Sequence, residues 1–219
     1  MDHLQAKLLH NRPELQDYRV LELHAPEIAA KAKPGQFAHV RVGSGVDPLL
    51  RRPFSVMLPN RHEGTIQLLI KNVGRGTDLL CHLREGVLVD VLGPLGSSFT
   101  SPPPGRDILM VAGGVGVAPL LYFADVLQTD ATAHYRVRGL YGGRTSDQLP
   151  LWTEFGGRCE EFYVATEDGS AGEQGLVTDL LEGQLQRGDV QVVYTCGPRA
   201  MMAKVAAMSA AAGVTCFVS

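Results

Sequence analysis

Along the first hundred residues, short apolar stretches alternate with turn residues in the pattern of small β-strands. Within 18–23 the hydrophobic and polar side chains alternate one by one, as in a strand with one buried face. A Pro34-Gly35 turn precedes the next such stretch. About six strands at this spacing, with one short helix over 77–83, predict a six-stranded antiparallel barrel. The clearest predicted strands are 18–23, 36–42, 54–58, 65–70 and 87–92.

Beyond residue 105 the apolar pattern changes from alternating to continuous. Residues 108–112 form an unbroken apolar run, which is typical of a parallel strand buried on both faces. Strands and helices alternate from there onward, which predicts a doubly wound parallel sheet. We therefore divide the chain into a barrel domain over 1–99, a proline-rich linker over 100–105 and an α/β domain over 106–219. The predicted strands of the second domain are 108–112, 137–141, 162–166, 190–195 and 214–218, and its helices are 118–127, 149–155, 176–181 and 199–212.

Composition and charge narrow the functional classes. The chain has 219 residues, of which 45% are hydrophobic and 20% charged, as in an ordinary globular protein. A formal net charge of −3 excludes the basic surface expected of a nucleic-acid-binding protein. The longest apolar run, 110–127, contains three glycines and Asp125, so a buried strand, turn and helix explain it better than a membrane span. No secretory signal is recognisable, and we expect a cytoplasmic protein.

Cysteine and histidine are too dispersed to predict a metal site. The four cysteines form no CxxC pair, and the seven histidines show no pair at helical ligand spacing. The cysteines are Cys81, Cys159, Cys196 and Cys216.

A glycine-rich turn lies between the first strand and the first helix of the second domain. Its residues, 113–119, are Gly-Gly-Val-Gly-Val-Ala-Pro. Missing side chains let a phosphate approach backbone N–H groups at a helix start, although a tight turn without a ligand has the same composition. Cys196-Gly197-Pro198 follows a later strand of the same sheet, and open α/β sheets bind ligands at this carboxyl edge. We therefore predict that Cys196 faces a cofactor; a small buried apolar role is the alternative.

A third turn, Thr166-Glu167-Asp168-Gly169-Ser170, follows the predicted strand 162–166. Its carboxylates would accept hydrogen bonds from ribose hydroxyls and would repel a 2′-phosphate, which favours NADH over NADPH. A solvated Asp-Gly turn is the alternative interpretation.

In the first domain, two arginines precede a predicted strand within residues 51–55, Arg-Arg-Pro-Phe-Ser. An arginine here can clamp a pyrophosphate through two parallel hydrogen bonds, and the backbone that follows can lie along a flat ring. Lys71-Asn72-Val73-Gly74-Arg75-Gly76-Thr77 opens the short helix and suggests a further phosphate contact. A solvated basic pair is the alternative for Arg51 and Arg52.

Taken in order, these motifs resemble those of the ferredoxin reductase family, in which a flavin-binding barrel precedes a nicotinamide-nucleotide-binding α/β domain. The motifs are Arg52-Pro53-Phe54-Ser55, Gly74-x-Gly76-Thr77, Gly93-Pro94-Leu95-Gly96, residues 113–119, and Cys196-Gly197-Pro198 with Met201-Met202. The resemblance covers about 6–219 and implies FAD, NAD and hydride transfer between them, with Ser55 and Cys196 nearest the reacting rings. The implied FAD contacts are Arg52, Pro53, Phe54, Ser55, Leu69, Ile70, Lys71, Gly76 and Thr77, and the expected NAD contacts are Gly113, Gly114, Gly116, Pro119, Asp168, Cys196, Gly197 and Pro198.

Within this family, residues 34–37, 50–55, 140–145 and 168–170 are most similar to the electron-transfer subunits of class 1B, NAD-dependent dihydroorotate dehydrogenases. The similarity implies a partner, the dihydroorotate dehydrogenase catalytic subunit, in a heterotetramer that serves pyrimidine biosynthesis. A stand-alone NAD(P)H-dependent flavin or ferredoxin reductase is the alternative. A further alternative is a non-catalytic module that binds a flavin or a nucleotide.

Those subunits continue into a cysteine-rich tail that binds a [2Fe–2S] cluster, which needs four closely spaced thiolates. Cys216 belongs instead to the predicted strand 214–218. We therefore expect no iron–sulfur centre within these 219 residues. Either the native chain is longer, or the protein is a member without the cluster.

Overall fold

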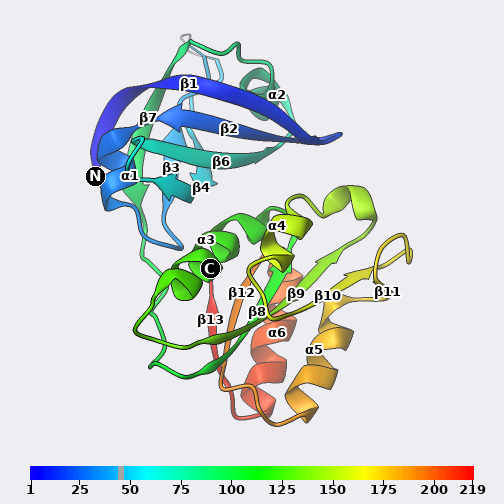
Figure 1. Cartoon of the computed structure of the whole chain (residues 1–219). Coiled ribbons are helices and arrows are strands. Elements are labelled where there is room, and N and C mark those ends of the chain that lie inside the picture. The colour runs from blue at the N-terminus through cyan, green and yellow to red at the C-terminus, as the bar shows by residue number, and fades with distance from the viewer. Residues whose placement is uncertain (44–46) are drawn as a thin grey trace. The chain divides into compact units, whose positions relative to one another are not determined.

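The computed structural model describes residues 1–43 and 47–219, which form two compact units, 1–98 and 99–219 (Figure 1). The first unit is an antiparallel sheet of seven strands in the order β4-β3-β7-β1-β2-β6-β5. Its two edge strands are separated along the chain by Val56 alone, so the sheet nearly closes into a barrel. The strands are β1 (Asp2–Leu15), β2 (Tyr18–His24), β3 (Phe37–Val40), β4 (Arg52–Ser55), β5 (Met57–Asn60), β6 (Thr65–Lys71) and β7 (Leu88–Leu95).

The barrel class is confirmed, but the count of six strands is wrong by one. The predicted strand 54–58 is divided between β4 and β5 at Val56, whose N–H donates to the Gln36 carbonyl over 2.9 Å. The alternation pattern also does not reveal β1, because its pairing with β2 shifts between Leu8 and His10 and again between Pro13 and Leu15. Each shift interrupts the period-two pattern by which a strand is recognised.

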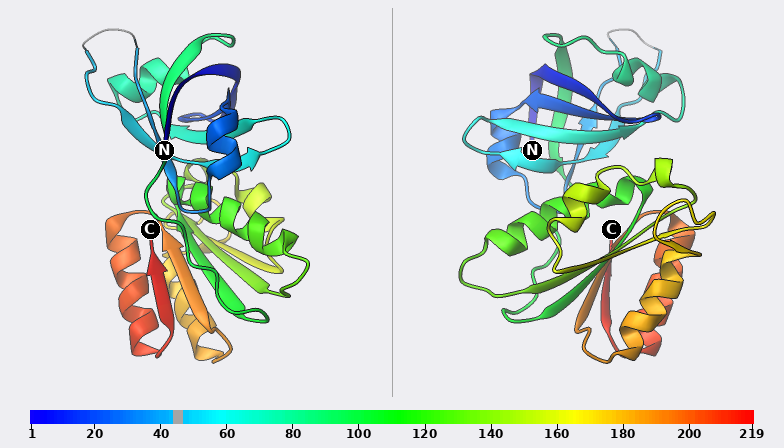
Figure 2. Two further views of the ribbon diagram at one scale, coloured as in Figure 1. Left: turned by 90° about the vertical axis from the view of Figure 1, so that its left-hand side faces the viewer. Right: turned by 45° about the vertical axis from the view of Figure 1, so that its right-hand side comes forward.

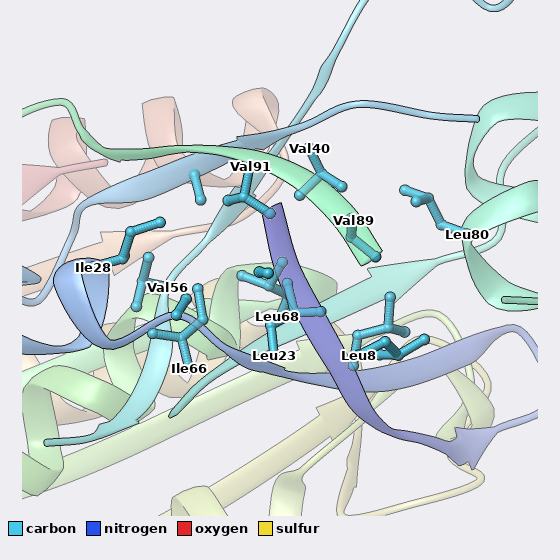
Figure 3. Close-up of a cluster of buried hydrophobic side chains, with 14 of the residues drawn as sticks. Leu8, Leu23, Ile28, Val40, Val56, Ile66, Leu68, Leu80, Val89 and Val91 are labelled. Atoms are coloured by element: carbon cyan, nitrogen blue, oxygen red, sulfur yellow. The ribbon is translucent and has the colours of Figure 1, made fainter. Parts of the chain in front are cut away.

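The core of the first unit lies inside the barrel. Figure 3 shows buried aliphatic side chains from the strands, including Leu8, Leu23 and Leu68, meeting there. Helix α1 (Pro26–Lys31) contributes Ile28, and helix α2 (Arg75–Cys81) contributes Leu80. Helix α2 begins two residues before the predicted helix 77–83, and α1, at six residues, is too short to show a helical period.

The second unit is the predicted doubly wound parallel sheet. Its six strands run in the order β11-β10-β9-β8-β12-β13, and every neighbouring pair is parallel. Five of them match the prediction, and the sixth, β11, is a two-residue edge strand too short to carry a sequence pattern. The strands are β8 (Asp107–Gly113), β9 (Arg136–Gly143), β10 (Glu161–Thr166), β11 (Glu173–Gln174), β12 (Val192–Cys196) and β13 (Thr215–Val218).

Helices cover both faces of this sheet (Figure 2). Helices α3 (Val117–Thr129) and α4 (Trp152–Gly156) pack together on one face, and α5 (Val177–Gln186) and α6 (Arg199–Ala211) on the other. Short 3₁₀ turns precede α3 at Gly114–Gly116 and α4 at Ser146–Gln148. Within the described part of the chain, no helix is long and apolar enough to cross a bilayer.

A buried arginine stabilises the end of this sheet where the strands begin. Arg138 of β9 is fully buried and donates to the Gln184 side chain and to the Asp189 carboxylate, each over 2.9 Å. A buried guanidinium is tolerated only when it is paired in this way. The network therefore ties β9 to the end of α5 and the loop that follows it.

Candidate functional site

The glycine-rich turn and the Cys196 turn meet at the carboxyl edge of the parallel sheet. From β8 the chain moves outward through β9, β10 and β11, and then returns to form β12 on the other side of β8. Such a reversal is a topological switch point, where open α/β sheets bind ligands. Ala112 and Cys196 are paired across β8 and β12, which brings the following residues, Gly113 and Gly197, together. The structure thus places the two turns side by side at this edge.

The two turns approach each other through backbone that carries no side chain. A Cβ added to Gly116 would lie 2.2 Å from the Cys196 carbonyl oxygen, and one added to Gly113 would lie 2.7 Å from Met201 Sδ. At Gly114 the space is open, since a Cβ there would meet nothing within 4 Å. Glycine is favoured at this position by the backbone conformation, with a φ of 52°. The turn therefore presents bare backbone to open space at Gly114 and packs tightly at the other two glycines.

A helical run begins within this turn. Gly114–Gly116 forms a 3₁₀ turn that leads directly into α3. The first N–H groups of a helical run have no partner inside it, so they are available to an anion. Pro119 is the third residue of α3 and is buried.

Cys196 ends β12 with its thiol largely buried. Burial raises the pKa of the Cys196 thiol to about 11, against a smaller opposite effect from a hydrogen bond with Ser219. The thiol is therefore protonated at neutral pH and is no thiolate base or nucleophile. Its position suits a small polarisable group that lines a binding site. Across 1–43 and 47–219, no group of three His, Cys, Asp or Glu side chains is placed to hold a metal ion.

The acidic turn after β10 lies against the residues that follow β9. The Asp168 N–H donates to the Arg144 carbonyl over 3.2 Å, and the Ser146 N–H donates to Ser170 Oγ over 2.8 Å. Ser170 donates through both its hydroxyl and its N–H to Asp168 Oδ1, and these bonds lower the pKa of the Asp168 carboxyl. Asp168 is thus an exposed, ionised carboxylate in a fixed orientation at the carboxyl edge, with Glu167 exposed beside it.

In the first unit, the structure separates the two neighbouring arginines. Arg51 forms an ion pair of 2.8 Å with Asp90, whose carboxylate also bonds to His3. Arg52 has no carboxylate within ion-pair distance among the residues that the structure describes, and its Nη1 donates to the Leu50 carbonyl over 2.7 Å. Arg52 is therefore the arginine whose charge is available to an anionic ligand.

Arg52 lies over the start of α2. A Cβ added to Gly76 would come within 3.0 Å of the Arg52 guanidinium, so the guanidinium rests against bare backbone. Thr77 Oγ1 accepts from the Val73 N–H and donates to the Gly74 carbonyl, both over 2.9 Å. A hydroxyl has a single proton, so the Thr77 hydroxyl closes the turn and has none left for a phosphate. If Thr77 contacts a phosphate as predicted, the donor is its backbone N–H.

The other residues predicted to bind FAD divide between two faces of the barrel sheet. Phe54 packs against the hydrophobic core, and Ile70 is part of it. Side chains alternate along a strand, so the neighbours of these two residues lie on the outer face of β4 and β6. A flat ring along that face would touch the outer side chains and only the backbone of Phe54 and Ile70. The residues of that face are Pro53, Ser55, Leu69 and Lys71, of which Leu69 is buried at 4% exposed.

Two family models match the chain. The oxidoreductase FAD-binding domain matches residues 6–99, and the oxidoreductase NAD-binding domain matches residues 110–207. Together with the barrel, the doubly wound sheet and the two bare turns, these matches define an FAD- and NAD-binding oxidoreductase of the ferredoxin reductase class.

Relatives with known names narrow the class. The "Dihydroorotate dehydrogenase B (NAD(+)), electron transfer subunit" of Desulforamulus reducens is 39% identical over 194 residues, which are 89% of this chain and 73% of that relative. The subunit of the same name from Bacillus caldolyticus is 39% identical over 80% of this chain and 66% of its own length. The chain belongs to the family of dihydroorotate dehydrogenase B electron transfer subunits.

Solved structures show the same architecture. The NADH-dependent reduced ferredoxin-NADP oxidoreductase, described for flavin-based electron bifurcation, is 29% identical and superposes with a TM-score of 0.85 over 99% of this chain and 76% of its own. The cytochrome b5 reductase domain of Ulva prolifera nitrate reductase, at 18% identity and a TM-score of 0.79, covers all of this chain and 97% of its own length. The second likeness concerns the fold alone.

Proposed function

We propose that this protein is the electron transfer subunit of a cytoplasmic, NAD-dependent dihydroorotate dehydrogenase. In this proposal the barrel domain, 1–99, holds FAD, and the α/β domain, 106–219, receives NAD, with 100–105 as the linker. The partner is a catalytic subunit that oxidises dihydroorotate in pyrimidine biosynthesis. When bound, FAD supplies the redox chemistry that connects the partner with NAD.

The contact between Gly116 and the Cys196 carbonyl carries the proposal. It brings two bare backbone turns together at a switch point within the segment that matches an NAD-binding domain. In the proposal, Gly113, Gly114 and Gly116 admit the pyrophosphate of NAD to the helix start, and Cys196, with Gly197 and Pro198, lines the nicotinamide position. The exposed Asp168 would receive a ribose hydroxyl and repel a 2′-phosphate, so NADH is the preferred form.

The barrel residues fit FAD in an equivalent way. Among the residues that the structure describes, Arg52 is a cation without a carboxylate partner, and it lies beside the bare backbone of Gly76, an arrangement suited to a pyrophosphate. Ser55 lies at the end of β4, on the outer face that would carry the flavin ring, and we assign its hydroxyl to orienting that ring. Arg51 is not assigned to FAD, because it forms an ion pair with Asp90.

The test is the visible spectrum of the purified protein under anaerobic conditions, supplied with FAD and then with NADH or NADPH. We expect flavin bands that NADH bleaches faster than NADPH. In a second arm, dihydroorotate should bleach them only when the dihydroorotate-oxidising subunit is present, and the two chains should co-purify. A protein that binds no flavin would refute the FAD assignment.

The similarity to ferredoxin-NADP oxidoreductase supports one alternative function, that of a reductase without an obligate partner. The same experiment separates the two functions. Reduction by NADH with rapid electron transfer to free flavin or ferredoxin, and no complex with the catalytic subunit, would support the alternative.

A further inference from the structure

The side chain of Tyr141 joins the glycine-rich turn to another loop. Tyr141 belongs to β9 and is fully buried. Its phenol oxygen lies 2.9 Å from the Gly114 carbonyl oxygen and 2.9 Å from the Pro150 carbonyl oxygen. The first carbonyl belongs to the turn after β8, and the second to the segment that leads into α4. One hydroxyl therefore connects two loops at the carboxyl edge of the sheet.

The Gly114 carbonyl accepts from two donors, the Tyr141 hydroxyl and the Val117 N–H of the 3₁₀ turn, and together they fix the orientation of a peptide group in the turn. In a trans peptide the C=O and the following N–H point in opposite directions. With its carbonyl held by these two donors, the peptide between Gly114 and Val115 directs the Val115 N–H away from the tyrosine. Val115 is 45% exposed, and a Cβ on Gly114 would meet no atom within 4 Å. The hydroxyl thus helps to hold this peptide in a turn that is open at Gly114 and exposed at Val115.

The second carbonyl lies in a strained part of the chain. Leu151, directly after Pro150, has a φ of 58°, in the left-handed region that costs a non-glycine residue on the order of 1 kcal/mol or more. Such a conformation persists only where neighbouring contacts hold it. The phenol has one proton for two carbonyls, so it couples the conformation of this segment to that of the glycine-rich turn.

We propose that Tyr141 is a positioning residue for NAD, which acts by orienting the Gly114–Val115 peptide toward the pyrophosphate. The inference rests on the proposed function, in which residues 113–119 receive NAD. It assigns a task to the Tyr141-Gly142-Gly143 motif, which otherwise contributes only to the family resemblance.

The test compares Tyr141→Phe with Tyr194→Phe. Tyr194 is a matched control, because it is also a fully buried tyrosine of the same sheet whose hydroxyl donates to one carbonyl, that of Thr100, over 2.6 Å. Loss of one neutral hydrogen bond predicts that Tyr141→Phe raises the Kd for NADH about three- to tenfold. The rate of flavin reduction at saturating NADH and the FAD content should be unchanged. Tyr194→Phe should leave all three values as in the wild type.

The single tryptophan provides a readout that does not depend on activity. Trp152 lies two residues after Pro150 and is 43% exposed. Without nucleotide, Tyr141→Phe should change its emission, and Tyr194→Phe should not. Gly114→Ala tests the same link with Tyr141 intact, because alanine disfavours the φ of 52°. It should weaken NADH binding and also change the Trp152 emission.

Three results would overturn the inference. The first is an equal NADH affinity in Tyr141→Phe and Tyr194→Phe. The second is an unchanged Trp152 emission in Tyr141→Phe. The third is weaker NADH binding in Gly114→Ala without a change in the Trp152 emission. If Tyr141→Phe does not fold, Gly114→Ala decides the question. A wild-type protein that binds no NADH would instead refute the proposed function, so the two failures are distinguishable.

Discussion

Replacing Gly116 by alanine should damage the NAD site. The new Cβ would lie 2.2 Å from the Cys196 carbonyl oxygen and 2.6 Å from the Gly197 nitrogen. Both neighbours are backbone atoms of a turn that follows a central strand, so no side-chain rotation relieves the contact. The turns must separate by about 1 Å to restore ordinary van der Waals distance.

Overpacking of this kind costs about 2–3 kcal/mol. If the turns separate in the folded protein, that energy appears as a Kd for NADH raised roughly 30- to 150-fold. If they do not separate, it appears as a lower free energy of unfolding of the second unit. The measurement is therefore NADH binding by titration, together with chemical denaturation, on the same protein preparation.

Gly183→Ala is the control for this experiment. Gly183 lies within α5, and a Cβ there would meet nothing within 4 Å. Alanine should raise the free energy of unfolding by about 0.5–1 kcal/mol through helix propensity and leave NADH binding unchanged. A Gly116→Ala protein with wild-type NADH affinity and wild-type stability would refute the argument that the bare turns form the site.

The remaining predictions concern the charged and the buried polar groups. Arg52→Ala should lower the FAD content of the purified protein, measured by absorbance at the flavin band. Arg51→Ala should retain FAD and lose only stability, measured by denaturation, because Arg51 is paired with Asp90. Burial raises the pKa of the Cys159 thiol to about 12 from 9.0, so the contribution of Cys159 to the free energy of unfolding should be constant well below pH 9 and fall above it, where the unfolded thiol ionises first. Cys159→Ala should make the free energy of unfolding fall less steeply in denaturation experiments between pH 8 and 10.5, and the buried Cys196 thiol should account for part of the fall that remains. Arg138→Met should lower the free energy of unfolding by about 2–3 kcal/mol, because it removes two hydrogen bonds of a buried guanidinium. An unchanged midpoint of denaturant unfolding would contradict the stabilising role of Arg138.

The parts of the fold that follow local rules are predictable from the sequence. The unbroken run at 108–112 predicts β8, because a strand buried on both faces needs no polar positions. The two glycine-containing turns can be found because each requires bare backbone beside a strand end. Elements without a local pattern are missed. Strand β1 is interrupted by register shifts, and β11 is two residues long.

The sequence by itself determined the order of the two domains, the turns that carry the candidate chemistry and the family to which they are similar. Only the tertiary structure decided which of those residues meet. It placed Gly116 against Cys196 across 80 positions of the sequence, and it closed the turn before α2 with the Thr77 hydroxyl. It paired Arg51 with Asp90, whereas Arg52 has no carboxylate partner within the described part of the chain. The physical reason is that periodicity and backbone conformation are local properties. Which distant residues touch depends on the order in which strands pair, and no single segment carries that information.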